Sequence, residues 1–339
     1  MITPPSQDAL SAARDRLAAL AIPAGALGRL GELAVWWSSV RGEATPAAPS
    51  NVRAVVFAGD HGVAAHGVSA YPSAVTGAMV RAFVSGVAGV AVLARQHDVH
   101  LRVQDLGVDG NFPDLDPAIS AYKIRRGTEP LHLTDPMTAD EAQRAVDAGA
   151  AIAAEEIAAG ADLLIGGDMG IGDTTTAAVL TAAVLGLPAV DVVGRGTGID
   201  DAALRVKTDV IDTALRRAQD RTSDPIDLLS ALGSPDIAAQ AGFISAAAQA
   251  GVPVLLDGAI ATAAALVAER LTPGVAPWLA AGHRSTEGAQ WHALKDLGLE
   301  PLLDLGMRLG EGSGAVAAVP LVRSAALLLS EMARLDELL

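Results

Sequence analysis

Glu311 stands between two glycines in "DLGMRLGEGSGAVAAVP", residues 304–320, just before a long apolar helical pattern. Glycines at this density let a backbone approach a ligand closely. A carboxylate in such a loop, backed by an apolar wall, is partly desolvated, so its pKa rises and it becomes suited to proton abstraction. Taken alone, the segment leaves two interpretations of Glu311 open, a general base and an ordinary loop carboxylate.

Six of the seven strands that the sequence predicts end in glycine plus a polar or acidic residue. In open α/β sheets, ligands bind beyond the carboxyl ends of the strands. Turn chemistry alone accounts poorly for six such ends, so we expect them to form one site. They are "AGDHGV" (58–63), "GGDMGIGDTTTA" (166–177), "GRGTGID" (194–200), "LDG" (256–258), "GHRSTEG" (282–288) and "LGEGSG" (309–314). With Glu311, the carboxylates at or beyond these ends are Asp60, Asp168 and Asp257.

The segment "GDMGIGDTTTAAVL" has the features of a phosphate-binding junction. Gly170 and Gly172 allow close backbone approach, and Asp173 or Thr174 can cap the helix that follows. Exposed amides at a helix N-terminus bind phosphate well. The segment is neither a Walker loop, since no Lys precedes the threonines, nor a G-x-G-x-x-G turn. A capped strand–helix junction without a ligand remains the alternative.

A second glycine-rich turn, "GRGTGID", contains Gly196. Lys207 follows on the next predicted helix, nine residues after Gly198. A phosphate ligand would be stabilised by such a cation. The alternative for Lys207 is a solvated surface lysine.

Several other chemistries find no support in the sequence. The chain has no cysteine, which excludes disulfides and thiolate catalysis. Its seven histidines show no H-x-x-x-H or H-E-x-x-H spacing, so we expect no metal. No G-x-S-x-G segment indicates a serine hydrolase. The net charge of −15 disfavours nucleic-acid binding through a basic face.

Runs of β-branched or leucine residues alternate with helical patterns, which predicts a parallel sheet covered on both faces. The strands are expected near 52–63, where the run ends in a glycine-rich loop, and near 100–107, 161–170, 188–198, 251–258, 277–283 and 301–306. A single helix is expected over about 75–96, between the first two strands. Helices without accompanying strands are predicted at both chain ends, over residues 7–21, 24–41 and 314–339. We therefore expect a small helical subdomain made from both ends (1–45 and 315–339) beside an α/β domain (46–314).

The weakly charged stretch 244–267 carries Gln249, Pro253 and Asp257, so we predict a helix, a strand and a helix there and not a membrane span. The N-terminus shows no signal-peptide pattern, so a cytoplasmic location is expected.

Several segments, in order, resemble the nicotinate-nucleotide–dimethylbenzimidazole phosphoribosyltransferases, enzymes of cobalamin nucleotide-loop assembly. They are "VVFAGDHGVAAHGVSAYPSAVTGAMV", "GDMGIGDTTTAAVL", "VGRGTGIDD", "PVLLDGAIATAAALVA", "AAGHRSTEGAQ" and "LGLEPLLDLGMRLGEGSGAVAAVPLVRSA". The resemblance covers roughly residues 10–335. It implies a Rossmann-like three-layer α/β/α fold with a mostly parallel sheet, a homodimer, no cofactor and no metal. The implied substrates are nicotinate mononucleotide and 5,6-dimethylbenzimidazole, which react to give α-ribazole 5′-phosphate and nicotinate.

The resemblance also implies roles for residues. Glu311 corresponds to the general base, and Asp168 to a carboxylate that assists near the ribose and nicotinate. The implied phosphate-binding residues are Gly170, Gly172, Gly310 and Gly312, with Asp173, Thr174, Gly196, Lys207 and Ser285 as further substrate contacts. Candidate walls for the benzimidazole are Tyr71, Val75 and Met79.

Two positions depart from the common family pattern "GEMGIGNTT". This chain has Asp168 in place of Glu, which shortens the reach by one methylene, and Asp173 in place of Asn, which adds negative charge beside the expected phosphate. We expect Asp173 to turn its oxygen toward backbone amides. Two alternatives stay open: the same scaffold acting on adenine, another benzimidazole or a phenolic base, and a non-catalytic nucleotide-binding relative.

Overall fold

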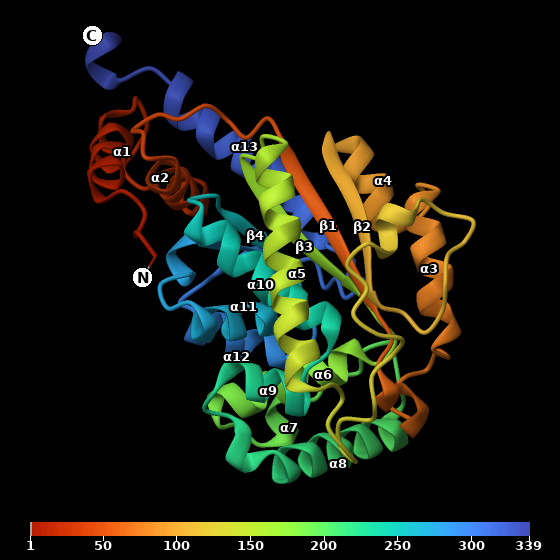
Figure 1. Ribbon diagram of the computed structural model, residues 1–339. Helices are drawn as coiled ribbons and strands as arrows, with labels where there is room; N and C mark the ends of the chain where they lie inside the picture. The colour runs from red at the N-terminus through yellow and green to blue at the C-terminus, as the bar shows by residue number, and fades with distance from the viewer. Residues whose placement is uncertain (1) are drawn as a thin grey trace.

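The computed structural model describes residues 2–339 and has a six-stranded, all-parallel sheet, so the predicted α/β class is confirmed (Figure 1). The strand order is β2-β1-β3-β4-β5-β6. The strands are β1 (Val52–Gly59), β2 (Val99–Gly107), β3 (Leu163–Met169), β4 (Val254–Leu256), β5 (Leu279–His283) and β6 (Pro301–Leu303). The strand expected at 188–198 was wrong. That segment forms one helical turn, α7 (Ala189–Val192), followed by an irregular loop.

The sheet changes direction beside its first strand. From β1 the chain builds β2 on one side and then places β3 on the other side. The crevice at such a switch point, beyond the carboxyl ends of the strands, is where α/β sheets bind ligands. Here those ends carry Asp60 after β1 and Asp168 in β3. Strand order therefore places these two strand ends, more than a hundred residues apart in the chain, at one edge of the sheet.

Helices cover both faces of the sheet. One layer contains α10 (Pro235–Gln249), α11 (Ala259–Leu271) and α5 (Ala139–Ala158), with α10 against β1 to β4 and α5 packed on α10. The opposite layer contains α3 (Ala74–Val84), α4 (Gly89–Gln96) and α13 (Ser313–Glu331). Four further helices are α6 (Asp173–Leu185), α8 (Asp201–Arg217), α9 (Pro225–Leu232) and α12 (Gly288–Asp296). Figure 1 shows α5 in front of the sheet and α8 along the bottom.

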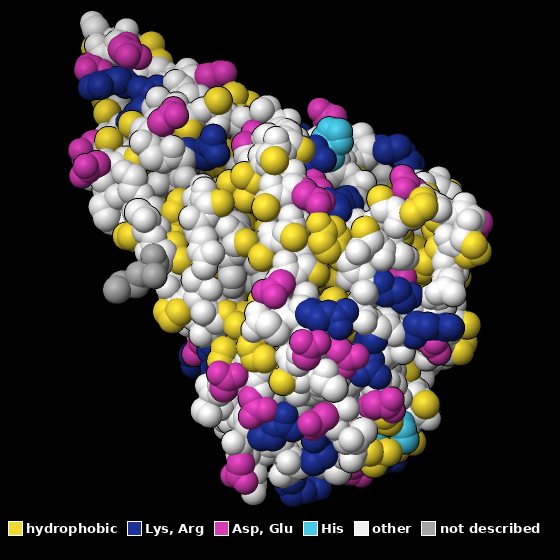
Figure 2. Space-filling model, viewed as in Figure 1, with side chains coloured by type: hydrophobic (Ala, Val, Ile, Leu, Met, Phe, Trp, Pro, Cys, Tyr) yellow, Lys and Arg dark blue, Asp and Glu magenta, His cyan; other side chains and the backbone are white. Residues whose placement is uncertain are grey.

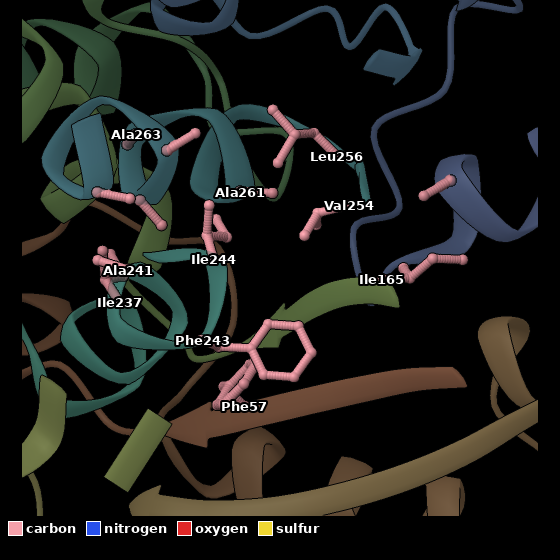
Figure 3. Packing of buried hydrophobic residues seen from close by; sticks show 14 of the residues in the cluster. Phe57, Ile165, Ile237, Ala241, Phe243, Ile244, Val254, Leu256, Ala261 and Ala263 are labelled. Atoms are coloured by element: carbon pink, nitrogen blue, oxygen red, sulfur yellow. The ribbon is translucent and has the colours of Figure 1, made fainter. Parts of the chain in front are cut away.

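The core between the sheet and the α10 layer is apolar and close-packed. Phe57 of β1 meets Phe243 of α10 edge to face, with ring centroids 5.4 Å apart, and Figure 3 shows the pair below Ile244 of the same helix. Most of the surrounding side chains are Ala, Val, Leu or Ile and are fully buried. The aromatic-poor composition thus forms a core of small and branched residues, in which backbones can lie close together.

The single helix expected over 75–96 is instead two helices. A turn at Ser85–Ala88, with Gly86 in the left-handed region at φ 77°, separates α3 from α4. Together they form an apolar stretch long enough by composition to cross a membrane, and α13 passes the same test. About half of the apolar window of α13 is buried inside the structure, as is typical of a core helix. The stretch 244–267 forms α10, β4 and α11, as predicted.

Both chain ends pack together. Helices α1 (Gln7–Ala19) and α2 (Arg29–Arg41) contact each other and α13, and the Arg16 guanidinium donates to the carbonyl oxygens of Leu329 and Ser330. Figure 1 places this group at one end of the molecule. Helix α13 runs without a break from the sheet into this group of helices, so the domain boundary at residues 45 and 315 stays a prediction. Met1 lies outside the described residues.

On the face shown in Figure 2, basic and acidic side chains are interspersed.

Candidate active site

A cavity of about 330 Å³ lies at the carboxyl ends of the strands. Its volume falls within the range typical of small-molecule sites. Eleven of the fourteen site residues expected from the sequence line it, and they come from segments spread over 240 residues of chain. These eleven are Tyr71, Val75, Met79, Asp168, Gly170, Asp173, Thr174, Gly196, Ser285, Gly310 and Glu311.

The other three expected residues lie just behind this wall. Gly172 is the N-cap of α6, in the left-handed region at φ 104°, and Gly312 is the N-cap of α13 at φ 89°. Lys207 is fully buried, and its ammonium donates to the Thr174 hydroxyl at 2.8 Å. Burial lowers the pKa of Lys207, while the charges of Glu287 and Asp173 oppose that shift. The surface-lysine alternative for Lys207 is therefore wrong.

Glu311 is 5% exposed and its side chain reaches into the cavity wall. Its Oε2 accepts a hydrogen bond of 3.0 Å from the backbone N–H of Val90, in the first turn of α4. Burial raises the pKa of the Glu311 carboxyl, the Val90 N–H lowers it, and the nearby charge of Asp257 raises it again, with a net upward shift. A raised pKa makes the carboxylate a stronger proton acceptor.

The backbone at Glu311 is unusual. Its φ is 66°, and it is one of only two non-glycine residues with positive φ among residues 2–339. Such a conformation is costly for a long side chain and persists only where the surroundings fix it. Its carbonyl also packs on β3, where a Cβ at Gly167 would lie 2.2 Å from that oxygen. Glycine at 167 is therefore required for the Glu311 loop to reach the sheet.

Asp257, directly after β4, binds the start of α13. Its Oδ2 accepts from the N–H of Gly312 at 3.1 Å, and its Oδ1 accepts from Gly314 at 2.8 Å and Ala315 at 3.1 Å. The sequence placed Asp257 at a strand end without a role. The Gly312 amide, expected to contact phosphate, is engaged by Asp257 in this structure.

Asp168 is 7% exposed, and neither of its oxygens has a hydrogen-bond partner among the described residues. Burial first, and then the neighbouring carboxylates of Asp236 and Asp173, raise the pKa of Asp168 well above its ordinary value. This shift favours the protonated form, which can donate a hydrogen bond. Despite its shorter side chain, Asp168 lines the cavity.

The phosphate-type loop at residues 170–174 rests on a buried histidine. The two ring nitrogens of His61 contact Thr176 Oγ1 at 2.8 Å and Asp236 Oδ2 at 3.1 Å. A Cβ at Gly170 would lie 2.8 Å from the His61 ring, so this glycine is needed for the close approach. Burial lowers the pKa of His61, but the Asp236 carboxylate more than offsets this and raises it overall.

Asp173 does not cap α6 as one alternative predicted, because the N-cap is Gly172 and Asp173 is the first helical residue. Its Oδ1 accepts from the Thr174 N–H at 2.6 Å, which agrees with the expected turn toward backbone amides. Burial raises the pKa of Asp173 to about 6, with the His61 charge acting in the opposite direction. The added carboxylate thus titrates near neutrality instead of carrying a fixed charge.

One wall of the cavity is apolar and comes from the α3 region. Val75 and Met79 are four residues apart on α3, so their side chains share one helix face. Tyr71, just before this helix, is 56% exposed at the cavity. Val75 and Met79 offer apolar surface to a flat heterocycle without hydrogen-bonding groups, and Tyr71 adds an aromatic ring that carries a hydroxyl.

Sequence reasoning missed several residues that line the same cavity, and three of them, His283, Glu287 and Arg308, carry titratable side chains. Glu287 accepts from the Gly196 N–H at 2.8 Å, Arg308 donates to the Gly196 carbonyl at 2.6 Å, and His283 is buried on β5. Glu287 and His283 lie within "GHRSTEG", and Arg308 precedes Glu311 by three residues. Their closeness in the chain to these motifs is the sequence feature that could have identified them as cavity residues. Among residues 2–339, no three His, Asp or Glu side chains gather as a metal would require.

A family model described as "Phosphoribosyltransferase" matches residues 2–338. The chain belongs to this phosphoribosyltransferase family. It is 52% identical over 332 residues to a nicotinate-nucleotide–dimethylbenzimidazole phosphoribosyltransferase of Mycobacterium avium, covering 98% of this chain and 95% of the relative. It is 48% identical over 336 residues to the protein of the same name from Mycobacterium leprae, covering 99% and 95%.

Solved structures of this phosphoribosyltransferase family agree with the fold. A crystal structure of the nicotinate-nucleotide–dimethylbenzimidazole enzyme from Thermus thermophilus matches with a TM-score of 0.93 and 42% identity over 98% of each chain. A second structure, titled CobT from the same organism, gives a TM-score of 0.93 and 44% identity, again over 98% of each chain. The family resemblance read from the sequence is confirmed, and the chain is an enzyme of the glycosyltransferase type.

Proposed function

We propose that the chain transfers the 5-phosphoribosyl group of nicotinate mononucleotide to 5,6-dimethylbenzimidazole, giving α-ribazole 5′-phosphate and nicotinate. The observation that carries this proposal is the position of Glu311, a buried carboxylate with a raised pKa on the wall of a cavity that also offers a glycine-rich loop and an apolar face. The relatives that carry this activity in their names match almost the whole chain.

Glu311 acts as the general base. Its carboxylate accepts the N–H proton of dimethylbenzimidazole, which makes the opposite ring nitrogen more nucleophilic. That nitrogen forms a bond to C1′ from the α face while the bond from C1′ to the pyridinium nitrogen breaks, and the electron pair leaves with nicotinate. The anomeric carbon inverts. Because the leaving nitrogen becomes a neutral pyridine, no acid is needed, and Glu311 afterwards releases its proton to solvent.

The remaining residues hold the two substrates. The α6 N-terminal loop with Gly170 and Thr174 lies over the buried ammonium of Lys207, a suitable place for the phosphate of the nucleotide. Val75 and Met79 form the wall against which the benzimidazole lies. Asp168 lines the same cavity, where its protonated form can donate to the ribose or to nicotinate. Holding both reactants in line supplies much of the rate enhancement.

The decisive experiment incubates the protein with nicotinate mononucleotide and, separately, dimethylbenzimidazole, unsubstituted benzimidazole, adenine and a phenol. Mass spectrometry then detects the riboside phosphates. The proposal expects efficient formation of α-ribazole 5′-phosphate. Preferred turnover of adenine or a phenol would favour the same scaffold with another base, since an apolar pocket discriminates a methyl by only about 1–3 kcal/mol. No product from any base, with nucleotide bound, would favour a non-catalytic relative.

Lys207 should contribute to nucleotide binding. Its ammonium lies directly behind Thr174 and Gly196, which line the cavity. Hydrogen bonds to charged groups are worth about 1.5–3 kcal/mol, so we expect Lys207→Met to raise KM for nicotinate mononucleotide by roughly 10- to 100-fold, with a smaller change in kcat. Steady-state kinetics measures both. Exposed Lys295 provides the control, since K295M should behave as wild type; an unchanged KM in K207M would remove Lys207 from the phosphate site.

The pH profile should show the raised pKa of Glu311. The base works only when deprotonated, so kcat/KM should fall as pH drops through a pKa above the ordinary value of 4.5. Asp173, with a pKa of about 6, adds a second titration, which D173N removes. The fall of kcat/KM at low pH, the acid limb of the profile, that persists in D173N is then assigned to Glu311. A profile in D173N that stays flat down to pH 4.5 would contradict the assigned role of Glu311.

We further propose that the enzyme is a cytoplasmic homodimer. Tyr71 and Leu309 line the cavity yet are 56% and 54% exposed, and a second copy would cover such apolar side chains. A nucleotide phosphate does not cross a membrane unaided, which favours a place of action where nucleotides are made. Light scattering on the purified protein gives the molar mass that decides the oligomeric state.

A further inference from the structure

Glu311 has a backbone conformation that is costly for its residue type. Its φ of 66° is unfavourable for a residue with a Cβ, and the neighbouring Gly310 and Gly312 also have positive φ, at 76° and 89°. Residues 310–313 form a tight turn, closed by a hydrogen bond of 2.9 Å from the Ser313 N–H to the Gly310 carbonyl, with Glu311 and Gly312 as its two central residues. This single bond does not engage the Gly312 N–H, so a group from outside the turn can hold the peptide that follows Glu311 and keep the side chain turned toward the cavity.

Asp257 is that outside group. It lies at the end of β4, is 3% exposed, and accepts three backbone hydrogen bonds from the residues that immediately follow Glu311. The first of these, from Gly312 to Oδ2, fixes the peptide directly after the base. The others, from Gly314 and Ala315 to Oδ1, join the first turn of α13 to the sheet. A negative charge at a helix N-terminus is also favourable.

The second fixed point of Glu311 comes from the other side. The Val90 N–H of α4 holds Oε2 at 3.0 Å. His283 of β5 packs against Gly314 and lies 3.3 Å from Asp257 Oδ1, which limits the movement of the Asp257 carboxylate. The base is thus held at its backbone by β4 and at its side chain by α4, two elements that are far apart in the chain.

We infer that Asp257 is a positioning residue for the reaction, which holds the Glu311 loop in its left-handed conformation through the Gly312 amide and so aims the base at the acceptor substrate. This inference rests on the proposed function, because it assumes that Glu311 is the base. Asp257 touches no reacting atom in this scheme. It acts through the loop and, by its charge, on the proton affinity of Glu311.

The test variant is Asp257→Asn. An asparagine oxygen at the Oδ1 position still accepts from Gly314 and Ala315, but its NH₂ group then faces the Gly312 N–H, donor against donor. The disturbance therefore falls on the peptide next to Glu311. Because a misplacement of about 1 Å can cost roughly 10²-fold in rate, we expect kcat to fall by about 10²-fold, with KM for nicotinate mononucleotide changed much less.

A pH profile separates this role from loss of stability. The groups near Glu311 are Asp257 on the β4 side, Asp168 on β3, His283 on β5 and Arg308 on its own loop, while α4 presents only the Val90 N–H. Of these charges, Asp257 contributes to the raised pKa of Glu311. Its neutralisation should therefore move the acid limb of kcat/KM to lower pH. A residue with only a structural role would leave the limb in place.

A double variant tests whether Asp257 acts through Glu311. If it does, D257N combined with E311Q should be no slower than E311Q alone, because the group it positions is already absent. Asp105 offers the matched control: it is fully buried at β2, accepts from the Val108 N–H at 2.8 Å, and is not among the residues that line the cavity. D105N should lower the melting temperature without changing kcat or the acid limb.

The outcomes are distinguishable. An active E311Q enzyme would reject the proposed mechanism, whereas an inactive E311Q with wild-type kcat in D257N would reject only the positioning role. An equal loss from D257N in the wild-type and E311Q backgrounds would also overturn that role. If D257N does not fold, the smaller D257S, whose hydroxyl and a water can satisfy the amides, replaces it with the same expectations. Failure of both variants to fold would make Asp257 a general stability residue and overturn the inference.

Discussion

Replacing Glu311 by glutamine is expected to lower kcat by about 10²- to 10⁴-fold, the usual contribution of a general base. The substitution keeps the size of the side chain, and the amide oxygen can still accept from the Val90 N–H. Only the ability to take up a proton is lost. Binding of both substrates should persist, because the glycine-rich loop and the α3 wall do not depend on the charge of Glu311.

Single-turnover kinetics measures the chemical step of E311Q, and isothermal titration measures binding of each substrate. Glu156 gives a control for the loss of a buried carboxylate, since it is 3% exposed and pairs with Arg53 and Arg102 away from the cavity. E156Q should lose stability while keeping kcat. Near wild-type turnover in E311Q, with both substrates bound, would mean that another group accepts the proton.

A large loss of stability is expected from Gly149→Ala, although the added group is one methyl. Helices α5 and α10 cross so closely that a Cβ at Gly149 would lie 1.7 Å from the Ala239 carbonyl oxygen. At the next contact, a Cβ at Gly242 would lie 2.0 Å from the Val146 carbonyl. Backbone cannot yield as a flexible side chain can, so the helices must move apart. We expect a destabilisation of about 3 kcal/mol, at the upper end for overpacked cores.

Chemical denaturation of G149A measures this loss directly. Gly77 in α3 is the matched control, because a Cβ there meets nothing closer than the Phe112 ring at 3.9 Å. G77A should be neutral or slightly stabilising, since alanine favours a helix over glycine by roughly 0.5–1 kcal/mol. An unchanged free energy of unfolding in G149A would show that the α5–α10 contact relaxes without cost.

The sequence predicted a strand at 188–198 where the structure has a helical turn, and it predicted one helix where the structure has α3 and α4. "PAVDVV" has the β-branched residues and flanking Pro of a strand, but a short apolar run does not distinguish a strand from a helical turn. In the fold, Ala189 and Val192 are buried three residues apart, as one turn of helix requires. The break between α3 and α4 depends on Gly86, which an Ala- and Val-rich periodic pattern conceals.

The sequence by itself determined the fold class, the family and eleven of the residues that line the cavity, because these depend on local patterns. Buried strands that end in glycine and acid must place those ends at one edge of a parallel sheet. Glu311, Asp168 and the residue 170–174 loop were therefore predictable from their neighbours in the chain.

Only the tertiary structure decided which groups hold the site together. The Val90 amide on Glu311, the Asp257 carboxylate on Gly312 and the Lys207 ammonium on Thr174 join residues 221, 55 and 33 positions apart. No periodicity or motif encodes such pairs. They depend on strand order and helix packing, which bring distant segments within hydrogen-bond distance only once the chain has folded.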